Sequence, residues 1–324
     1  MDAPTPPTGP ASTLRPLLVF NHIPKCAGTA ITGALQAALS PVRPVYYLDR
    51  ALVGGYDDFS QLDPVARSRF VFSPEELPDA DYVHGHITPG TTMARYPDAP
   101  HVTILRNPHS RVISQWVHGR SLTDLDLRHW GPAYAFRIAR RPLGEYLRHE
   151  MIAPNIDNTI TRFLTWPHAA LQPTAFIAEA DDEVLVETAV KTLDSFLHVD
   201  VVENRAFLER LGEKLGVTVA GGRLNDRSAH PPVVPTDLAG ELDEETRALL
   251  DHRTRLDRRV WAHVVEQVMP GADADQLLAD GLADSVRRYR ELPARKPQGS
   301  LVRRTAERAF ALKARLDPRL RGFR

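Results

Sequence analysis

Residues 22–30, with the sequence HIPKCAGTA, place a lysine, a glycine and a threonine in one short loop. An apolar run precedes the loop, and apolar residues at helical spacing follow it: Ile31, Leu35 and Leu39. A strand, a tight loop and a helix start predict an anion site, because the loop amides and the helix N-terminus converge on one point. Lys25 adds a full positive charge there. We therefore expect this loop to bind a phosphate group.

The order of residues in the loop differs from that of the common nucleotide-binding loop. The Walker pattern places Gly, Lys and Ser or Thr together, so that the hydroxyl group can hold magnesium. Here Lys25 precedes Gly28 by three residues. A P-loop nucleotide kinase-like enzyme is the alternative interpretation, but its Gly-Lys-Ser/Thr loop is absent from the sequence and no strand-end aspartate for magnesium is evident.

Two further segments carry reactive side chains where predicted strands end. Strands are expected at residues 16–21, 45–48, 81–84 and 101–105. His84-Gly85-His86 follows the third of these strands, and Arg106 follows the fourth. The carboxyl ends of parallel strands share one edge of a sheet, which is where ligands bind in open α/β sheets. The loop, His86 and Arg106 are therefore expected to line one cleft.

Arg106 and Ser114 form a second candidate phosphate site. Arg106 ends the fourth strand, and Ser114 lies one to two turns into the helix that follows. A guanidinium fork and a hydroxyl group together suit a phosphate monoester. The alternative is that Arg106 only forms a salt bridge at the sheet edge and that Ser114 has no role in binding.

These segments together resemble the carbohydrate-type (family 2) PAPS-dependent sulfotransferases, where PAPS is 3′-phosphoadenosine 5′-phosphosulfate. Residues 22–29 look like the 5′-phosphosulfate loop of that family, residues 106–114 are similar to its 3′-phosphate segment, and residues 84–86 resemble the segment with its catalytic base. The resemblance spans roughly residues 15–268. Weaker likeness occurs at residues 158–162, 199–207, 224–225 and 256–261.

The resemblance implies transfer of the sulfuryl group of PAPS to an acceptor hydroxyl, without a metal. His86 would be the catalytic base and Lys25 would contact the bridging oxygen of the donor. The donor-binding residues would be Lys25, Ala27, Gly28, Thr29, Ala30, Arg106 and Ser114. The acceptor would be a glycan, a glycolipid or a natural product, and the residues nearest to it would be His84, Asn158 and Arg162.

Three residues depart from the family pattern. Cys26 stands where threonine is more usual, and Ala30 stands where serine or threonine is more usual, so a hydroxyl ligand of the phosphate is missing. Asn107 replaces a more usual aspartate, which would weaken a local turn or salt bridge. A catalytically inactive, donor-binding protein is therefore a further alternative.

The alternation of strands and helices predicts an α/β fold, with a P-loop-like, mainly parallel sheet flanked by helices and a helical acceptor-facing region. Helices are expected at residues 134–150, 181–193 and 203–215, and as one or two helices at 241–268. Residues 1–14 are expected to be disordered, 15–284 to form the sulfotransferase domain, and 285–324 to form a basic, partly helical tail. Arg223, Asn225 and Arg227 either close over the nucleotide or are solvated. Trp116, Trp130 and Trp166 are core residues or sugar-stacking platforms.

The overall composition favours a cytoplasmic protein. Charge is nearly balanced, with 40 basic and 41 acidic residues, so a nucleic-acid-binding surface is not expected. The single cysteine, Cys26, permits no internal disulfide and suits a reducing compartment. No window approaches the roughly 20 apolar residues of a membrane span. The N-terminus has neither the basic start nor the apolar core of a secretory signal.

Basic residues concentrate in the tail at residues 285–324. Thirteen Arg and Lys side chains stand there against three Asp and Glu, a local charge of +10. Apolar residues recur among the cations at loosely helical spacing: Val302, Ala306, Ala309, Phe310, Leu312 and Leu316. The pattern is that of an interfacial helix drawn to an anionic membrane, although docking on the acidic body of the protein or self-association would also suit it.

Overall fold

Six parallel strands form the sheet, in the order β3-β2-β4-β1-β5-β6. The computed structural model describes the 324-residue chain except for residues 1–16, 51–61, 132, 221–230, 295–300 and 319–324. The expectations for residues 1–14 and for Arg223, Asn225 and Arg227 therefore lie outside the described residues. The strands are β1 (Leu18–Asn21), β2 (Pro44–Asp49), β3 (Phe70–Val71), β4 (Tyr82–His86), β5 (His101–Leu105) and β6 (His198–Val201).

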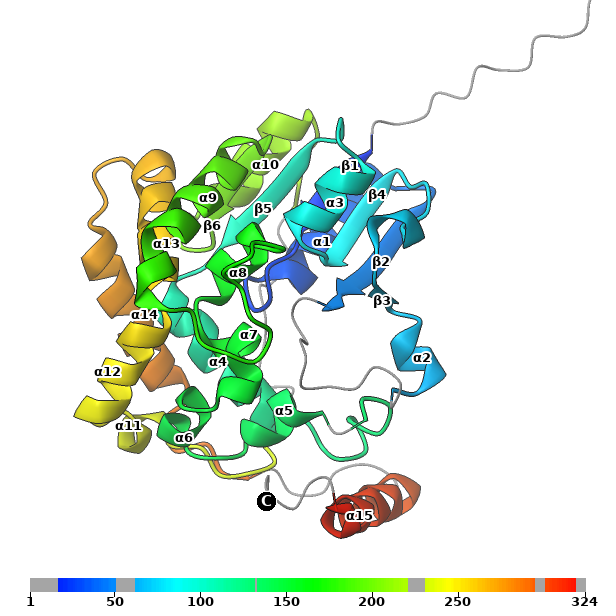
Figure 1. The fold of residues 1–324 in the computed structure, drawn as a ribbon, viewed down its shortest axis with the longest axis vertical. Helices are drawn as coiled ribbons and strands as arrows, with labels where there is room; N and C mark the ends of the chain where they lie inside the picture. Colours follow the sequence, from blue (N-terminus) through cyan, green and yellow to red (C-terminus); the bar gives the residue numbers. More distant parts are fainter. Residues whose placement is uncertain (1–16, 51–61, 132, 221–230, 295–300, 319–324) are drawn as a thin grey trace, which may run out of the picture.

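Helices cover both faces of the sheet, so that β1 and β5 are buried throughout (Figure 1). Leu18 and Phe20 of β1 pack in one cluster with residues of α1 (Gly28–Leu39) and α10 (Phe207–Leu215). Val19, which points the opposite way, packs with Tyr96 at the end of α3 (Pro89–Arg95). This alternation along β1 is the two-residue period expected of a strand covered on both sides.

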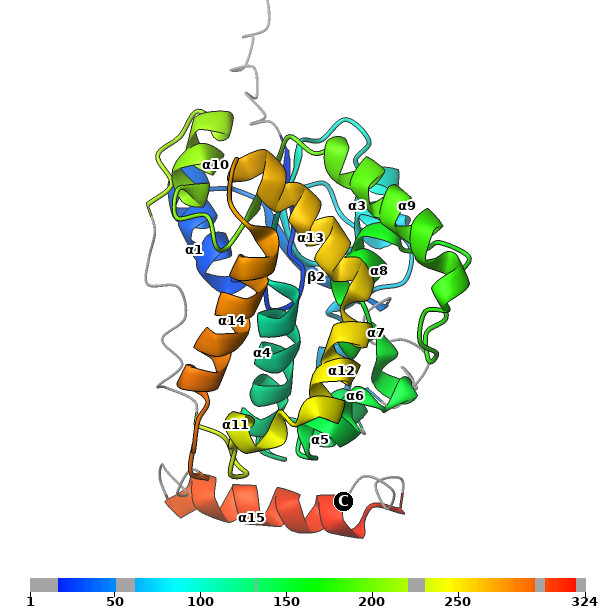
Figure 2. The ribbon, with the colours of Figure 1, turned by 90° about the vertical axis from the view of Figure 1, so that its left-hand side faces the viewer.

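The carboxyl edge of the sheet faces a region built almost entirely of helices (Figures 1 and 2). Its centre is α4 (Pro108–Ser121), which carries Val112, Ile113 and Trp116 into a second core. The other helices around the sheet and this core are α2 (Pro64–Arg67), α5 (Tyr134–Ile138), α6 (Leu143–Leu147), α7 (Ala153–Ile156), α8 (Thr159–Thr165), α9 (Asp182–Asp194), α11 (Leu238–Glu241), α12 (Glu244–Arg253), α13 (Arg255–Val268) and α14 (Ala274–Arg288). A separate helix, α15 (Leu301–Leu316), follows.

Two buried side chains fasten α8 and α13 to each other by reciprocal capping. Asn158 Oδ1 accepts hydrogen bonds from the amides of Leu256 and Asp257 at the start of α13, at 2.8 and 3.4 Å. The Asp257 carboxylate accepts from the amides of Ile160 and Thr161 at the start of α8, at 3.1 and 2.8 Å. Each helix thereby satisfies first-turn amides that it cannot satisfy itself.

Several element boundaries differ from those expected. The single helix expected at 134–150 is interrupted, because Pro142 forms the N-cap of α6 and α5 ends before it. His84, Gly85 and His86 form the last part of β4 instead of following it, and His86 is the strand's last residue. The stretch 241–268 contains two long helices, α12 and α13, preceded by the end of the short α11.

The described part of the tail has two different structural contexts. Helix α14 continues through the boundary expected at residue 285, and both Ser285 and Tyr289 are buried. Leu292 then pairs with Thr236 in an isolated antiparallel bridge. The segment that is separate from the body therefore begins beyond these residues and includes α15. No helix among the described residues is both long enough and apolar enough to cross a membrane.

Candidate functional site

The loop between β1 and α1 leaves the N-terminus of α1 open. Ala27 is the N-cap residue, at φ 59°, and its methyl side chain forms no capping hydrogen bond. Helices α4, α12 and α14, by contrast, are capped by the side chains of Asn107, Asp243 and Asp273. The first amides of a helix have no intrahelical acceptor, so an uncapped start favours an anion.

Backbone strain in this loop supports a binding role. Lys25 has φ 69° and Ala27 has φ 59°, so two residues with side chains adopt the left-handed conformation within three positions. Each such residue costs of order 1–3 kcal/mol. Four others are dispersed over the rest of the described chain, at Ser40, Ala133, Asn158 and Glu291, so the pair in this loop is distinguished by its close spacing. The strain turns the backbone into the concave form that an anion occupies.

Position 28 has room only for glycine, because the His22 side chain lies against it. A Cβ atom at this position would lie 1.9 Å from atoms of the His22 imidazole. That ring has little freedom to retreat, because it stacks on Phe20 with centroids 5.7 Å apart and contacts the His86 ring at 4.3 Å. Burial above all, and repulsion from the neighbouring histidine His86 and from the Lys25 ammonium group when His22 is protonated, hold the pKa of His22 well below its usual value. A neutral imidazole therefore forms the floor of the loop.

His86 is held in the form of a base. Its Nδ1 lies 2.7 Å from the carbonyl oxygen of His22, which can only accept, so Nδ1 carries the proton and Nε2 keeps its lone pair. Burial lowers the pKa of His86 to about 4, the bond to the His22 carbonyl opposes that shift, and Lys25 adds to it. At neutral pH the ring is uncharged and Nε2 can accept a proton.

Arg106 supports the loop from the opposite side. Its Nη1 donates to the carbonyl of Lys25 at 3.2 Å. Glu203 lies nearby: its Oε1 accepts from the Asn107 amide at 3.0 Å, and the charge of Arg106 partly offsets the rise in its pKa that burial causes. Because β1 lies between β4 and β5, His86 and Arg106 flank the loop from its two sides.

A cavity of about 350 Å³ opens beside the loop. Five of the residues expected at the site line it: Lys25, Ala27, Gly28, Thr29 and His86. Aromatic side chains form another part of its lining: Tyr46, Phe70, Trp130 and Phe136. Trp130 makes edge contacts with Phe70 and Phe136, at centroid distances of 6.1 and 6.5 Å. The cavity thus joins an anion-binding loop and a base to a broad apolar surface.

The expected residues His84, Ala30, Arg106 and Ser114 do not line this cavity; Arg106 lies behind the loop, on the Lys25 carbonyl. His84 shares a face of β4 with His86, but its ring packs against Tyr46 and Tyr82 and its Nε2 lies 3.4 Å from Gln36 Nε2. Ser114 is completely buried within α4. Among the described residues, the geometry therefore gathers the loop, His86 and Arg106, but it does not bring Ser114 to the cavity.

Asn158 and Arg162, which were expected near the acceptor, are buried in a structural network. Asn158 caps α13, as described above. Arg162 donates from Nη2 to Asp157 Oδ2 at 2.8 Å and from Nη1 to the Gln172 carbonyl at 3.1 Å. Their hydrogen-bonding groups serve the packing of α8, so neither side chain lines the cavity.

Two of the departures from the family pattern have a structural explanation. Cys26 is buried in a hydrophobic cluster with Ile23 and Leu105, and burial raises the pKa of its thiol to about 12. Its side chain is therefore outside the cavity, and a hydroxyl group there is not required for the loop. Asn107 caps α4 through its Oδ1, which accepts from the Ser110 amide at 3.0 Å, and its Nδ2 donates to the carbonyls of Leu277 and Leu278.

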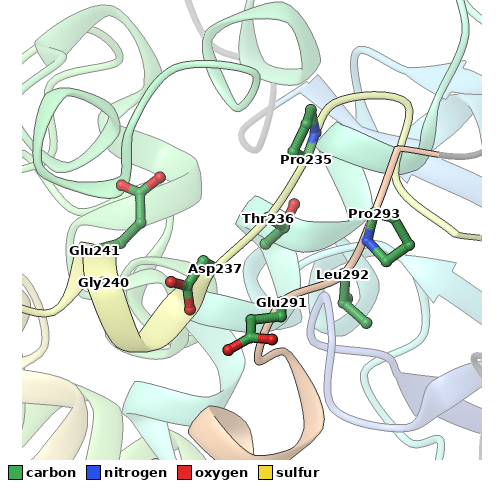
Figure 3. A pocket seen from close by; sticks show the side chains of 8 residues that line it. All are labelled: Pro235, Thr236, Asp237, Gly240, Glu241, Glu291, Leu292 and Pro293. Atoms are coloured by element: carbon green, nitrogen blue, oxygen red, sulfur yellow. The ribbon is translucent and has the colours of Figure 1, made fainter.

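A wider cavity of about 530 Å³ lies elsewhere, between the segment that leads into α11 and the residues after α14 (Figure 3). Among the described residues, its lining includes the carboxylates Asp237, Glu241 and Glu291 and no basic side chain. Glu241 is engaged in holding the amide of Leu143, at 2.6 Å. This cavity does not suit an anionic ligand, so the loop after β1 remains the candidate site.

Sequence reasoning missed several residues of the site. His22 was visible only as part of the loop motif, and its position directly after β1 was the available signal. Asp49 ends β2 and lines the cavity, where its Oδ2 accepts from the hydroxyls of Thr88 and Thr91 at 2.8 and 2.6 Å. Gln115, His118 and Asn155 also line it. No motif surrounds these residues, so only the fold could reveal them.

Comparison with known proteins finds no family model and no curated protein that matches this chain. Within the part of the chain that the structure describes, no three histidine, cysteine, aspartate or glutamate side chains come together as a group that could hold a metal ion. The chemistry of the site must therefore be argued from the loop, the base and the cavity themselves.

Proposed function

We propose that this protein is a sulfotransferase that moves the sulfuryl group of PAPS to the hydroxyl group of an acceptor. The observation that carries this proposal is the arrangement around β1: an uncapped helix start with Lys25 lies between a neutral histidine base at the end of β4 and an arginine directly after β5. PAPS has phosphate groups at two positions and an activated sulfuryl group at one end. A P-loop-like cradle with an additional cation on one side and a base on the other suits that distribution.

The residues of the loop fit the charge of such a donor. The amides of Gly28 and Thr29 and the Thr29 hydroxyl would hold the 5′-phosphate, and Lys25 would neutralise charge on the leaving oxygen. Arg106 would contact the 3′-phosphate with its guanidinium group, which also holds the carbonyl of Lys25. The fit is incomplete at Ser114, because its side chain is buried in α4.

His86 would act on the acceptor. Its Nε2 would take the proton of the acceptor hydroxyl as that oxygen bonds to sulfur and the sulfur–oxygen bond to the 5′-phosphate breaks. The leaving group is then adenosine 3′,5′-bisphosphate, and the proton remains on His86 until it is lost to solvent. A base with its proton fixed on Nδ1 is oriented for this transfer.

The aromatic lining of the cavity would hold the body of the acceptor. Trp130, Phe136 and Phe70 offer flat surfaces for the apolar face of a sugar ring or for a hydrophobic portion of the acceptor. This lining suits a glycan, a glycolipid or a hydroxylated natural product. The described residues of the lining include no arginine and one lysine, Lys25, so they offer no further basic surface to a highly acidic acceptor.

The position of Asp49 is the one observation that favours the alternative function, that of a magnesium-dependent nucleotide enzyme. A carboxylate at a strand end within the cavity is a feature of magnesium-dependent nucleotide enzymes, although here one of its oxygens already accepts two threonine hydroxyls. The neighbouring loop lacks the hydroxyl that would follow a Walker lysine. A kinase-like enzyme therefore remains the alternative to test.

Thermal-shift measurements with adenosine 3′,5′-bisphosphate and with ATP–magnesium separate the two functions. We expect the bisphosphate to stabilise the protein more than ATP–magnesium at equal concentration, since ligand binding to the native state raises its apparent stability. Stronger stabilisation by ATP–magnesium would contradict the proposal. Transfer of radiolabelled sulfate from PAPS to a panel of hydroxylated acceptors then distinguishes an enzyme from a catalytically inactive binding protein.

A further inference from the structure

Helix α15 lies along the bottom of the molecule in both views, below α5 and α11 (Figures 1 and 2). It touches the body through few interactions: Arg303 lies 3.8 Å from Asp126, and Phe310 borders a cavity of about 260 Å³ shared with Leu127. A second cavity, of about 330 Å³, separates Arg308 and Ala311 from Val234. None of the side chains at 302–316 is buried. The helix therefore rests on the body without contributing to its core.

The outward face of α15 is an apolar stripe. Four apolar residues and one threonine follow one another at alternating spacings of three and four, which places them on one side of a helix: Val302, Thr305, Ala309, Leu312 and Leu316. Val302, Leu312 and Leu316 are 79%, 57% and 71% exposed and are among the most exposed large apolar side chains that the structure describes. Solvent exposure of three such side chains on one helix is unfavourable, so this stripe requires a partner.

Cations border the stripe on both sides. Arg304, Arg308 and Arg315 follow one flank at helical spacing, and Lys313 lies on the other flank. Arg304 and Arg308 border the cavity with Val234, and Lys313 borders the cavity with Phe310, but these three side chains and that of Arg315 are exposed. The acidic residues Glu307 and Asp317 border the same two cavities and are half-buried. Within the described part of α15, the exposed charges beside the stripe are therefore positive.

This combination argues against a second copy of α15 as the partner. The three-four spacing would suit a coiled coil, but Thr305 and Ala309 would occupy its seam over little more than two heptads. Arg308, Lys313 and Arg315 would flank that seam in both copies and repel each other. An anionic partner would instead turn each of these cations into a favourable contact.

We propose that the outward face of α15 is a docking surface for an anionic lipid bilayer. Val302, Leu312 and Leu316 enter the boundary between head groups and acyl chains, while the flanking arginines bind lipid phosphates through their guanidinium forks. Lys313 extends its ammonium group to the head-group level from the other flank. Apolar burial and charge attraction are both needed, as is typical of helices that lie in a membrane interface.

Co-sedimentation of the full chain with large unilamellar vesicles tests this proposal. The vesicles contain phosphatidylcholine alone or with about 30% phosphatidylglycerol, a content that supplies an anionic surface. We expect the protein to pellet with the anionic vesicles and to stay in solution with the neutral ones. Binding should fall as salt is raised, because the charge contribution is screened over about 10 Å at 0.1 M ionic strength. Absence of binding to anionic vesicles would overturn the proposal.

Substitutions measure separately how much the apolar stripe and its flanking cations contribute to vesicle binding. The triple variant Val302→Ser, Leu312→Ser and Leu316→Ser should bind anionic vesicles at least about tenfold more weakly, since it loses most of the apolar area. The matched control is Val42→Ser, Val184→Ser and Leu197→Ser, which removes three exposed apolar side chains from other elements and should bind like the wild type. Arg304→Gln, Arg308→Gln and Arg315→Gln should each weaken binding about fivefold at low salt.

Two further measurements distinguish insertion into the bilayer from self-association of the protein. Leu312→Trp adds a fifth tryptophan, on the stripe, to the four that the chain already has. The difference between the emission of this variant and that of the wild type should shift to shorter wavelength with anionic vesicles; an unchanged difference spectrum would contradict insertion. Light scattering without lipid reports oligomeric state. A wild-type dimer that the stripe variant converts to a monomer, without vesicle binding, would identify a second copy as the partner and overturn the lipid proposal.

Discussion

At the scale of single residues, the two histidines at the end of β4 differ in what they face. Both have a pKa lowered to about 4, mainly by burial, but only His86 lines the cavity. His86→Ala should lower turnover by about 10²–10⁴-fold, because a positioned base typically contributes that much. The stabilisation by adenosine 3′,5′-bisphosphate should be nearly unchanged. Steady-state kinetics and thermal shifts measure the two effects separately.

His84→Ala is the matched control for this experiment, since it removes the same side chain from the same face of the strand. It should leave turnover within a few-fold of the wild type. The pH profile adds a second check: kcat/KM should decline only as pH falls toward 4, where free His86 becomes protonated. Near-normal turnover of His86→Ala, or a loss as large in His84→Ala, would contradict the assignment of the base.

Gly28 offers a test of the loop itself. Gly28→Ala would place a methyl group 1.9 Å from the His22 ring, which Phe20 and His86 confine. The ring must move, and the loop and His86 with it, so binding of adenosine 3′,5′-bisphosphate should weaken at least about tenfold, or about 1.4 kcal/mol. Isothermal titration measures this change.

Gly33→Ala is the control, because it lies in the same helix and a Cβ there meets nothing within 4 Å. Alanine is a better helix former than glycine, so this variant should be as stable as the wild type or more stable by up to about 1 kcal/mol. Equal binding by both variants would show that the contact between Gly28 and His22 does not control the loop.

The residues that the sequence could identify are those whose role depends on their neighbours in the chain. Lys25, Gly28 and Thr29 share one loop, and His86 and Arg106 end strands, so their common edge follows from strand order. Trp130 and Asp49 could not be found this way, because their place at the cavity depends on packing between distant elements. Ser114 was predicted to face a pocket and does not. Helical spacing permits that orientation, but nearly every residue of α4 is buried by packing, so spacing alone does not show which residues reach a cavity.

At the scale of elements, Asn107 joins α4 to α14 in a way that an aspartate cannot. Its Oδ1 caps α4, and its Nδ2 donates to two carbonyls of α14, at 3.0 and 3.2 Å. Asn107→Asp keeps the cap but directs a carboxylate oxygen at these carbonyls in a fully buried site. The free energy of unfolding should fall by at least roughly 1–3 kcal/mol. Chemical denaturation measures it.

Asp243→Asn provides the comparison, since it exchanges the same two side chains at the N-cap of α12. There the carboxylate accepts from the amide and the side chain of Thr246 and the residue is exposed, so the change should lower the free energy of unfolding much less than Asn107→Asp does. Similar losses in the two variants would mean that the amide bonds of Asn107 do not hold α14.

Most elements near the sheet followed from sequence because strands and helices alternate there. β1, β2, β4 and β5 each contain a run of apolar or β-branched residues bounded by a turn or a proline. The helical region was harder to predict, since its pieces are short and are held by tertiary contacts. The break at Pro142 was visible in the sequence, but the capping of α8 by Asp257, about 100 residues away, was not.

At the scale of the whole molecule, burial of histidines couples folding to pH. His84 gives the simplest case, because burial alone lowers its pKa to about 4. An unfolded chain has a histidine pKa near 6.5, so at pH 5 the unfolded form carries a proton on His84 that the folded form lacks. Protons therefore favour unfolding, and the stabilisation due to His84 is present above pH 6.5 and is lost as pH falls toward 4.

Comparison of the wild type with His84→Gln isolates this contribution from that of the buried carboxyl groups, whose raised pKa values act in the opposite direction. Denaturant unfolding at pH 7 and pH 5 gives four free energies. The advantage of the wild type over the variant should shrink by about 1 kcal/mol at the lower pH, after allowance for the partial exposure of the ring. An advantage that stays constant or grows would show that the folded protein does not exclude the proton from His84. The claim that burial lowers the pKa of His86 would then fail as well, and the proposed role of His86 as a base depends on its being neutral in the folded state.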